Sequence, residues 1–304
     1  MRRLSLLLGS AALLLAGCGK QAVEPEPAAP VAVVLRVALD AGGSTKAYSD
    51  GTGATRLEVL VYRVSADGLR YEEDRSVRDA VIPGSTELLL YLTPGLEYRI
   101  ACWAQHPEGP YALDPASGTV TVNPKGPANA EQRDAFFGSW SGRVDADTQI
   151  DVVLRRPFAQ LSVLTTDADW QAARDNGIRF AGSSMSLTAP TVLDLISGGV
   201  SEPAMYALDA AAVEPDQAAQ AGYKLLAMNY ILAPAQESSA TVGFGIYKAG
   251  SAGALYSWEV PEVPYQRGYR TFIQGNIFSV DAAFSVVIAP GYDAPAHAAS
   301  ASGE

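Results

Sequence analysis

Apolar residues recur at every second position in many short runs along this chain, and the first of these runs is the most regular. It covers residues 31–39 and is followed by a polar, Gly-rich stretch that contains Lys46. A period of two residues is typical of a β-strand with one buried face. We therefore predict a strand over 31–39. Its buried face is predicted to carry Val31, Val33, Leu35, Val37 and Leu39.

Runs of the same kind, rich in β-branched and aromatic residues, continue to residue 289. Turn residues such as Asp67-Gly68 and Thr93-Pro94-Gly95 separate them. Further strands are predicted at 55–65, 86–92, 96–105, 148–154, 158–165, 178–188, 223–232, 241–248, 256–263, 271–280 and 284–289. One helix is predicted at 167–177, which has an N-cap candidate, an Ala-rich interior and a closing glycine. This pattern indicates an all-β fold of two β-sandwich domains in tandem, with one short helix in the second.

The segments without alternation are assigned by composition. They are predicted to be a loop at 106–117, a short helix or irregular aromatic segment at 130–137, and a loop with some helix at 202–221. Pro157 interrupts the chain between two strands, so a domain boundary is placed after Arg155. The predicted parts are an N-terminal domain at 31–155, a C-terminal domain at 156–290 and a disordered tail at 291–304.

The first 30 residues have the pattern of an export signal and a tether. Two arginines precede an apolar run from Leu4 to Leu15, which is shorter than the roughly 20 residues that span a bilayer. The sequence Leu15-Ala16-Gly17-Cys18 that follows resembles the lipobox of bacterial lipoproteins. The resemblance implies that 1–17 are a signal peptide and that Cys18 becomes the lipid-carrying N-terminus, with acyl chains such as palmitate. Residues 18–30, rich in Pro, Ala and Glu, are predicted to be an extended tether.

The charge and the cysteine content of the chain argue against a nucleic-acid partner and against an internal disulfide. The chain has 22 Lys and Arg against 33 Asp and Glu, and loss of residues 1–17 leaves 20 basic residues and a net charge of −13. Nucleic acids are recognised by clustered Lys and Arg, so no nucleic-acid partner is expected. After lipidation of Cys18 only Cys102 remains, so no internal disulfide is possible. Cys102 lies in an apolar run and is expected to be buried and inert.

Motifs of enzymes and cofactor sites are nearly absent. His106 lies in a Pro/Gly loop and His297 in the tail, which makes no metal-ligand set, and no nucleotide-binding Gly-rich motif or nucleophile elbow is present. We therefore expect no enzyme activity, no metal and no cofactor. Four tryptophans, Trp103, Trp140, Trp170 and Trp258, offer surfaces for glycan binding if exposed, but β-sandwiches usually bury Trp.

Several stretches resemble the fimbrillin family, the lipoprotein precursors of type V pili. They are Ser44–Gly51 with Leu57–Tyr62, Val153–Leu161, and Val260–Ser279 with Arg267, Tyr269, Arg270, Thr271, Gly275 and Asn276. Their order and spacing, together with the lipobox and the final strand, carry the resemblance. It implies two transthyretin-like β-sandwich domains and a fimbrial subunit at the cell surface, anchored to outer-membrane lipid as a precursor.

The resemblance also implies a maturation step. A trypsin-like protease cuts after a basic residue beyond the first strand, that strand leaves, and a C-terminal strand of the next subunit fills the groove. Here the matching bond is Lys46-Ala47, although well-known members have Arg at that position. Phe284, Val286 and Ile288 share one face of the last strand and are the donor candidates. The partners would be other fimbrial subunits, in a homopolymer or a mixed pilus.

Two other functions stay open on the sequence. One is a fimbrial anchor or accessory lipoprotein that keeps its lipid and its first strand. The other is a surface glycan-binding lipoprotein. A solvated loop lysine at Lys46, with no cleavage, and an ordinary last core strand at 284–289 are the simpler interpretations of the two candidate sites.

Overall fold

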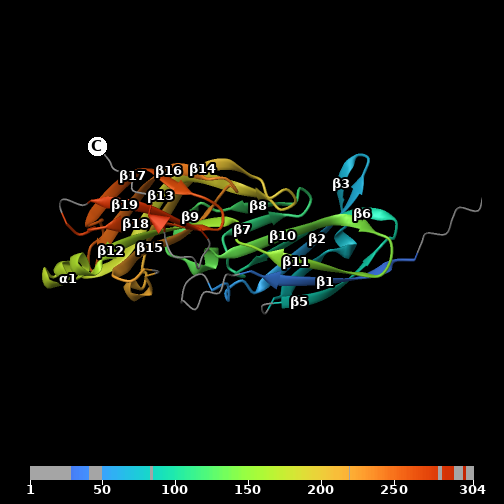
Figure 1. Cartoon of the computed structure of the whole chain (residues 1–304), viewed down its shortest axis with the longest axis horizontal. Helices are drawn as coiled ribbons and strands as arrows, with labels where there is room; N and C mark the ends of the chain where they lie inside the picture. Colours follow the sequence, from blue (N-terminus) through green and yellow to red (C-terminus); the bar gives the residue numbers. More distant parts are fainter. Residues whose placement is uncertain are drawn as a thin grey trace, which may run out of the picture.

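The chain forms an elongated all-β molecule in which two halves lie end to end along the long axis (Figure 1). The computed structural model describes residues 29–40, 50–82, 85–218, 220–279, 283–290 and 297–298. Within these ranges strands dominate and one α-helix occurs, which confirms the predicted all-β class. The same ranges contain no helix of sufficient length and hydropathy to cross a membrane.

The first half is built from two sheets that face each other. The first sheet has three strands in the order β11-β1-β5, which are Thr148–Leu154, Val31–Leu39 and Ser85–Leu92. The second sheet has the order β10-β6-β2-β3, which are Ala135–Val144, Leu96–Gln105, Arg56–Ser65 and Gly68–Tyr71, with β4 (Val77–Val81) also paired to β2. Short 3-10 turns occur at Glu73–Arg75 and Glu131–Arg133.

The central strands of the second sheet, β6 and β2, are buried on both faces. On one face Val59, Ile100 and Cys102 join the core shared with the first sheet. On the opposite face Leu60 and Trp103 belong to a larger core that continues into the second half. A strand covered on both sides needs apolar residues at every position, which explains why 100–104 reads Ile-Ala-Cys-Trp-Ala without polar alternation.

The second half is a sandwich of a seven-stranded and a five-stranded sheet. The third sheet runs β17-β16-β13-β14-β9, which are Tyr256–Tyr265, Ser238–Lys248, Phe180–Asp194, Val200–Ala211 and Lys125–Pro127, with β8 (Thr119–Val122) paired to β13 and β7 (Tyr111–Asp114) paired to β8. The fourth sheet runs β15-β12-β18-β19-β20, which are Tyr223–Leu232, Phe158–Thr166, Tyr269–Gly275, Phe284–Pro290 and His297–Ala298.

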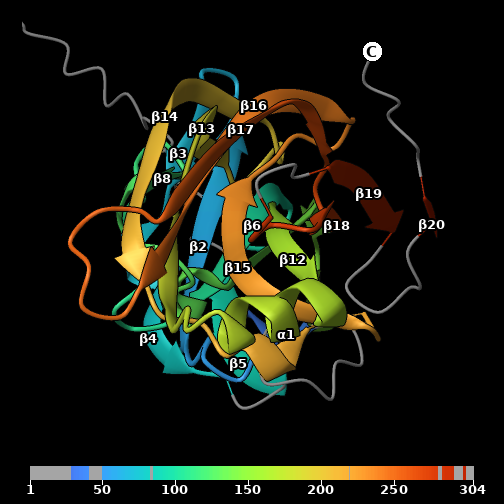
Figure 2. The same cartoon turned by 90° about the vertical axis from the view of Figure 1, so that its left-hand side faces the viewer.

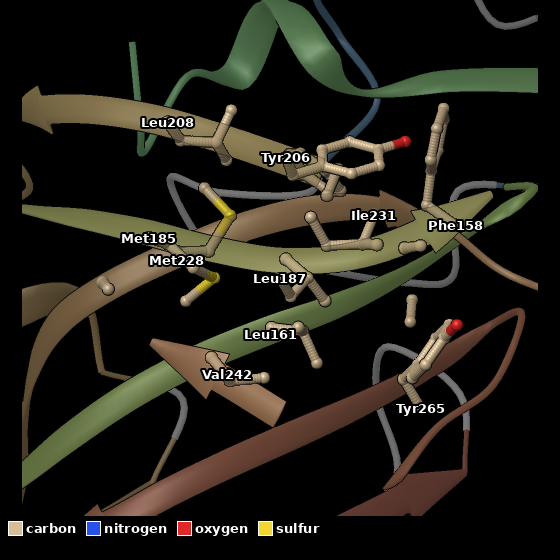
Figure 3. Close-up of a cluster of buried hydrophobic side chains, with 14 of the residues drawn as sticks. Phe158, Leu161, Met185, Leu187, Tyr206, Leu208, Met228, Ile231, Val242 and Tyr265 are labelled. Carbon is tan, nitrogen blue, oxygen red and sulfur yellow. The ribbon is translucent and has the colours of Figure 1, made fainter. Parts of the chain in front are cut away.

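Side chains from both of these sheets fill the larger core. Figure 3 shows Leu161 of β12, Leu187 of β13 and Val242 of β16 packed together, with Met185 and Met228 beside them. The helix α1 (Asp167–Asp175) follows β12 directly and lies at the outer end of this half (Figure 2). It starts where the Thr166 side chain accepts a hydrogen bond from the Asp169 amide, an N-cap that satisfies one free backbone donor. The predicted helix is therefore confirmed, with Thr166 as its cap.

Several elements differ from the predicted ones. Residues 111–114, inside the loop expected at 106–117, form β7, which pairs with β8 at 119–122, where no element was predicted. Residues 135–144 form β10, of which only 135–137 lie in the segment expected to be a short helix or irregular. Residues 200–211 form the long strand β14 in place of a loop with some helix, followed by a 3-10 turn at Pro215–Gln217. Pairing with distant strands stabilises these segments, and their Ala, Pro and Gly content gives little local indication of it.

The chain crosses between the two halves more than once. The predicted domain boundary after Arg155 falls in the link between β11 and β12, but β8 and β9 from the N-terminal side pair with β13 and β14 of the third sheet. A row of aromatic contacts spans the same junction: ring centroids lie 5.1 Å apart for Trp103–Tyr111, 5.9 Å for Tyr111–Phe158 and 6.3 Å for Phe158–Tyr230. The two halves are thus joined by strands and by a shared core.

A buried ion pair also lies at this junction. The Arg156 guanidinium donates two hydrogen bonds to the Asp134 carboxylate, at 2.7 and 2.8 Å, and both side chains are almost fully enclosed. The same guanidinium lies 4.6 Å above the ring of Phe136. Burial raises the pKa of Asp134, and Arg156 opposes that shift. Removing one partner would leave an uncompensated buried charge, so this pair fixes how β10 meets β12.

Candidate functional site

The candidate metal-ligating and nucleophilic side chains lie apart from one another in the described residues. These residues contain no group of three or more His, Cys, Asp or Glu side chains arranged to hold a metal ion. The Cys102 thiol is fully buried, and burial raises its pKa to about 12, so it is neutral and enclosed at ordinary pH. His106 lies at the surface beside Gly53, and its ring nitrogen accepts a hydrogen bond from the Glu108 amide. The feature that stands out is the position of the first strand.

β1 is the central strand of the first sheet, between two partners that are far away in the sequence (Figure 1). It is antiparallel to β5, with Val31 opposite Leu92 and Ala38 opposite Ser85. It is parallel to β11, with Val33 opposite Thr148 and Leu39 opposite Leu154. The strand has the predicted bounds, 31–39. Because β1 is the middle strand, its removal would separate β5 from β11 and open a slot about 10 Å wide, which is two strand spacings.

The inward face of β1 closes the smaller core of the molecule. Val33, Leu35 and Val37 have no exposed surface, and Val31 and Leu39 are partly buried at the two ends. The slot walls are Leu88, Leu90 and Leu92 of β5 with Ile150, Val152 and Leu154 of β11, and its floor includes Val59, Ile100, Cys102 and Phe136 of the second sheet. Each fully buried Val or Leu contributes about 1.5–3 kcal/mol through burial.

The outward face of β1 is partly exposed and carries a charge. The Arg36 Nε donates a hydrogen bond to Glu87 of β5 at 2.6 Å, and both side chains are at least half exposed. On the other side of Arg36 the opposite residue is Asp151 of β11. Next to this position Val34 lies opposite Leu89 of β5, which is 53 % exposed, and Ala32 lies opposite Tyr91, which is 58 % exposed. The outer surface of the slot therefore has an acidic position and an apolar position.

Both ends of β1 are held by the β11 side of the slot. The Ala32 amide donates to the Asp147 carboxylate at 2.8 Å. At the other end the Asp40 amide donates to the Leu154 carbonyl at 2.8 Å, and the Asp40 carboxylate pairs with Arg155 at 3.3 Å. The predicted lipidation site Cys18 and the predicted cut between Lys46 and Ala47 lie outside the described residues, as does most of the tail 291–304.

The predicted donor strand is β19, in the other half of the molecule. Phe284, Val286 and Ile288 do share a face there, since they lie opposite Gly275, Ile273 and Thr271 of β18. The Phe284 ring packs edge-on against Trp258 and Phe244, at 5.3 and 5.9 Å between centroids. Val286 on this face and Val287 and Ala289 on the other face are buried, while Phe284 and Ile288 are partly buried. The structure therefore does not bring the donor candidates near β1, and in this conformation β19 is a core strand buried on both faces.

The tryptophans considered for glycan binding do not form an exposed platform. Trp103 is fully buried, and Trp140 packs against the smaller core. Trp170 packs against Phe180 and Phe278, and Trp258 against Phe284. The sequence analysis did not identify the residues that lie beside the outward face of β1, namely Glu87, Leu89, Tyr91 and Asp151. Alternation marks each as an outward position of its strand, but only the sheet register places them beside β1.

Comparison with known proteins gives a family and a fold. Residues 25–302 match the model of DUF6562, which is described as a family of unknown function. No curated protein sequence matches the chain. A candidate polysaccharide-binding protein (DUF1812) from Bacteroides thetaiotaomicron has a TM-score of 0.52 at 10 % identity, over 88 % of this chain and 98 % of that one. A candidate adhesin from the same organism has a TM-score of 0.51 at 12 % identity, over 89 % of this chain and 98 % of that one.

A more distant match is the tip fimbrial protein Mfa3 from Porphyromonas gingivalis, with a TM-score of 0.44 at 11 % identity, over 86 % of this chain and 99 % of that one. The matches to the two Bacteroides thetaiotaomicron structures cover nearly the whole length of those structures. The chain therefore shares their complete fold. At such low identity the likeness concerns the fold alone.

Proposed function

The chain belongs to the DUF6562 family of unknown function, and we propose from the setting of β1 that it is a structural subunit of a fimbrium at the bacterial cell surface. In this proposal β1 is a placeholder strand that leaves during maturation. A strand of a neighbouring subunit then takes its place, and repetition of this step builds a filament. The protein has no enzymatic role and needs no cofactor.

One observation carries the proposal: a nine-residue strand near the start of the chain is the central strand of a sheet and closes a core. Along the chain, β1 is connected to every later strand through residues 41–49. A single cut in that segment therefore releases β1 as a unit. The resemblance of the sequence to fimbrillins and the fold shared with a candidate adhesin support the same role.

The energetics favour replacement over simple loss. Without β1 the slot would expose the backbone groups of β5 and β11 and the apolar side chains below, which is a strongly adhesive edge. An extended segment of another chain restores the ladder and refills the pockets, as in donor-strand complementation. Because the donor and the acceptor are different surfaces of each subunit, the contact is head-to-tail and forms open filaments.

The finer steps of the proposal follow the predicted sites. The precursor is exported by its signal peptide, is lipidated at Cys18 and reaches the outer membrane. A trypsin-like protease then cuts between Lys46 and Ala47, in a Gly/Ser/Thr-rich segment. The donor is the last strand of the next subunit; in a homopolymer that strand is β19 of a second copy, with Phe284, Val286 and Ile288 entering the slot. That strand must first leave its place between β18 and the second-half core, so donation requires β19 to be displaced.

The test is the N-terminal residue of the protein recovered from the surface of cells that produce the full chain. Ala47 is expected for a processed subunit, and filaments should be visible by electron microscopy. A Lys46→Gln variant should keep β1 and form no filaments. An Arg56→Gln variant, which removes the next basic residue at the start of β2, is the matched control and should be processed normally. Recovery of the chain with Cys18 at its N-terminus, and no filaments, would refute the proposal.

A second candidate role, an anchor or accessory subunit that retains β1 and its lipid, is favoured by the contacts at both ends of the strand. Asp147 holds Ala32, and Arg155 with the Leu154 carbonyl holds Asp40. A strand secured in this way is suited to stay in place. The same experiment separates the roles, because an anchor would keep Cys18 and would be found at the membrane-proximal end of filaments made by other subunits.

A further inference from the structure

The outer rim of the slot carries a pair of carboxylates that face one position of β1. The residue opposite Arg36 is Glu87 on the β5 side and Asp151 on the β11 side. Arg36 bonds to Glu87 at 2.6 Å, and Gln149 donates to the Asp151 carboxylate at 3.0 Å. Opposite charges on directly opposed strand positions attract, and like charges repel. Arg36 is therefore a cation at a position with an acidic residue on each side, and it forms its ion pair with Glu87.

Loss of β1 would remove this cation and leave Glu87 and Asp151 on the two walls of the open slot. No other cationic side chain of the described chain forms an ion pair with either of them. An incoming strand places a residue between the two carboxylates in the register that Arg36 occupied. A basic residue there regains the lost attraction, whereas an acidic residue adds a third negative charge.

From this geometry we propose that the slot selects a partner strand with a basic residue at the position of Arg36. The inward positions would be aliphatic, and the residue two positions before the basic one would be apolar, to lie beside Leu89 as Val34 does. This inference rests on the replacement of β1 proposed above, and it names the kind of strand that replaces it.

The C-terminal strand of this chain does not meet the charge requirement. Residues 271–304 contain no Lys or Arg at all, and they contain Asp281, Asp293 and Glu304. The outward positions of β19 that would face the carboxylates are Ser285, Val287 and Ala289. A second copy of the chain is thus a poorer donor than a different subunit whose last strand carries Lys or Arg. The slot favours a mixed filament over a homopolymer.

The experiment measures the entry of labelled peptides into the slot of the full chain after it has been cut at Lys46. Four peptides with identical Gly/Ser ends are compared: residues 31–39, the same with Arg36→Ser, residues 284–290, and the same with Val287→Arg. Fluorescence anisotropy gives their affinities, and native mass spectrometry confirms that the nicked β1 has been displaced. Each basic peptide is expected to bind about three- to tenfold more tightly than its neutral counterpart at low ionic strength.

Two controls test whether the preference for basic peptides arises from Glu87 and Asp151. Salt at about 0.5 M shortens the screening length and should reduce the preference to less than about twofold. A Glu87→Gln/Asp151→Asn receptor should lose it, while an Asp209→Asn/Glu259→Gln receptor, with the same change in net charge on the third sheet, should keep it. Equal binding of basic and neutral peptides would overturn this inference and leave strand replacement standing. If no peptide enters, the native 31–39 peptide included, strand replacement falls and this inference falls with it.

Discussion

The first strand and the last long strand of this chain, β1 and β19, are both paired within a sheet, but they are embedded in opposite ways. β1 has backbone partners on both sides, a buried inward face and an outward face in solvent. β19 pairs along its full length with β18 and, at Val287 and Ile288 only, with the two-residue strand β20, and it has buried side chains on both faces. β1 is thus held by two long ladders and by one core, while β19 is held by one long ladder and by side-chain packing on both faces.

This difference indicates which strand is suited to exchange. A strand with one face toward solvent can be replaced by any strand that has suitable inward residues, because the outward positions tolerate substitution. A strand covered on both faces must match two surfaces at once. The slot of β1 is therefore a general acceptor site, whereas release of β19 from its own sheet is the demanding step of the proposed assembly.

The largest expected effect comes from removing each strand. Deletion of residues 1–46 removes three fully buried side chains, worth about 5–9 kcal/mol together, which approaches the total stability of an ordinary domain. Hydrogen exchange should show β5 and β11 losing protection while β12 and β18 keep theirs, and added 31–39 peptide should restore it. Deletion of 284–304 should expose β18 and resist rescue by peptide, because two surfaces must be matched. Equal rescue of both deletions would contradict the contrast between the strands.

The strand β1 was predictable from the sequence, but its surroundings were not. Alternation over 31–39 gave its bounds and its buried face, since a half-buried strand has a period of two. Its neighbours could not be identified in that way, because the parallel partner β11 lies more than a hundred residues along the chain and pairing has no local signature. The long strand β14 was missed because its Ala, Asp, Glu and Pro residues suit loops, and its pairing with β13 decides its structure.

Cys102 offers a sharper measure of whether the slot is open. Its thiol lies in the core that β1 closes, and burial raises its pKa to about 12. Exposure would return the pKa toward about 8.5, which increases the thiolate fraction at neutral pH on the order of a thousandfold. Alkylation should therefore be very slow in the intact chain, fast after β1 is released, and slow again once a donor strand is bound. Unchanged alkylation after release of β1 would mean that the smaller core stays closed without it.

Single substitutions on the two faces of β1 should separate the contribution of buried side chains to stability from the contribution of backbone pairing. Leu35→Ala truncates a side chain with no exposed surface, so the free energy of unfolding should fall by about 2–5 kcal/mol. Val34→Ala, the outward neighbour, is the matched control and should cost less than about 1 kcal/mol. Urea denaturation followed by circular dichroism gives both values. Similar losses for the two variants would show that the outward face is covered in solution.

The corresponding substitution in β19 should be damaging on its inward face. Phe284→Ala removes ring contacts with Phe244 and Trp258, and since Phe284 is only partly buried we expect a loss of about 2–3 kcal/mol. Ile273→Val in the paired strand β18 is a milder core change and should cost about 0.5–1.5 kcal/mol. Tryptophan fluorescence, to which Trp258 contributes together with the other three tryptophans, follows the unfolding. If Phe284→Ala left stability unchanged, β19 would be held more loosely than its contacts indicate.

The smallest expected effect belongs to Arg36. Its ion pair with Glu87 joins two side chains that are at least half exposed, so Arg36→Ser should lower the free energy of unfolding by at most about 1 kcal/mol, and by less at high salt. Glu87→Gln should give a similar loss, and the double variant should lose little more than either single one, because both remove the same pair. A loss above about 2 kcal/mol for Arg36→Ser alone would show that Asp151 also binds Arg36 strongly. The small size of this contribution to folding is compatible with a role in choosing a partner, because a few-fold difference in affinity is enough to favour one donor strand over another when both fit the same apolar slot.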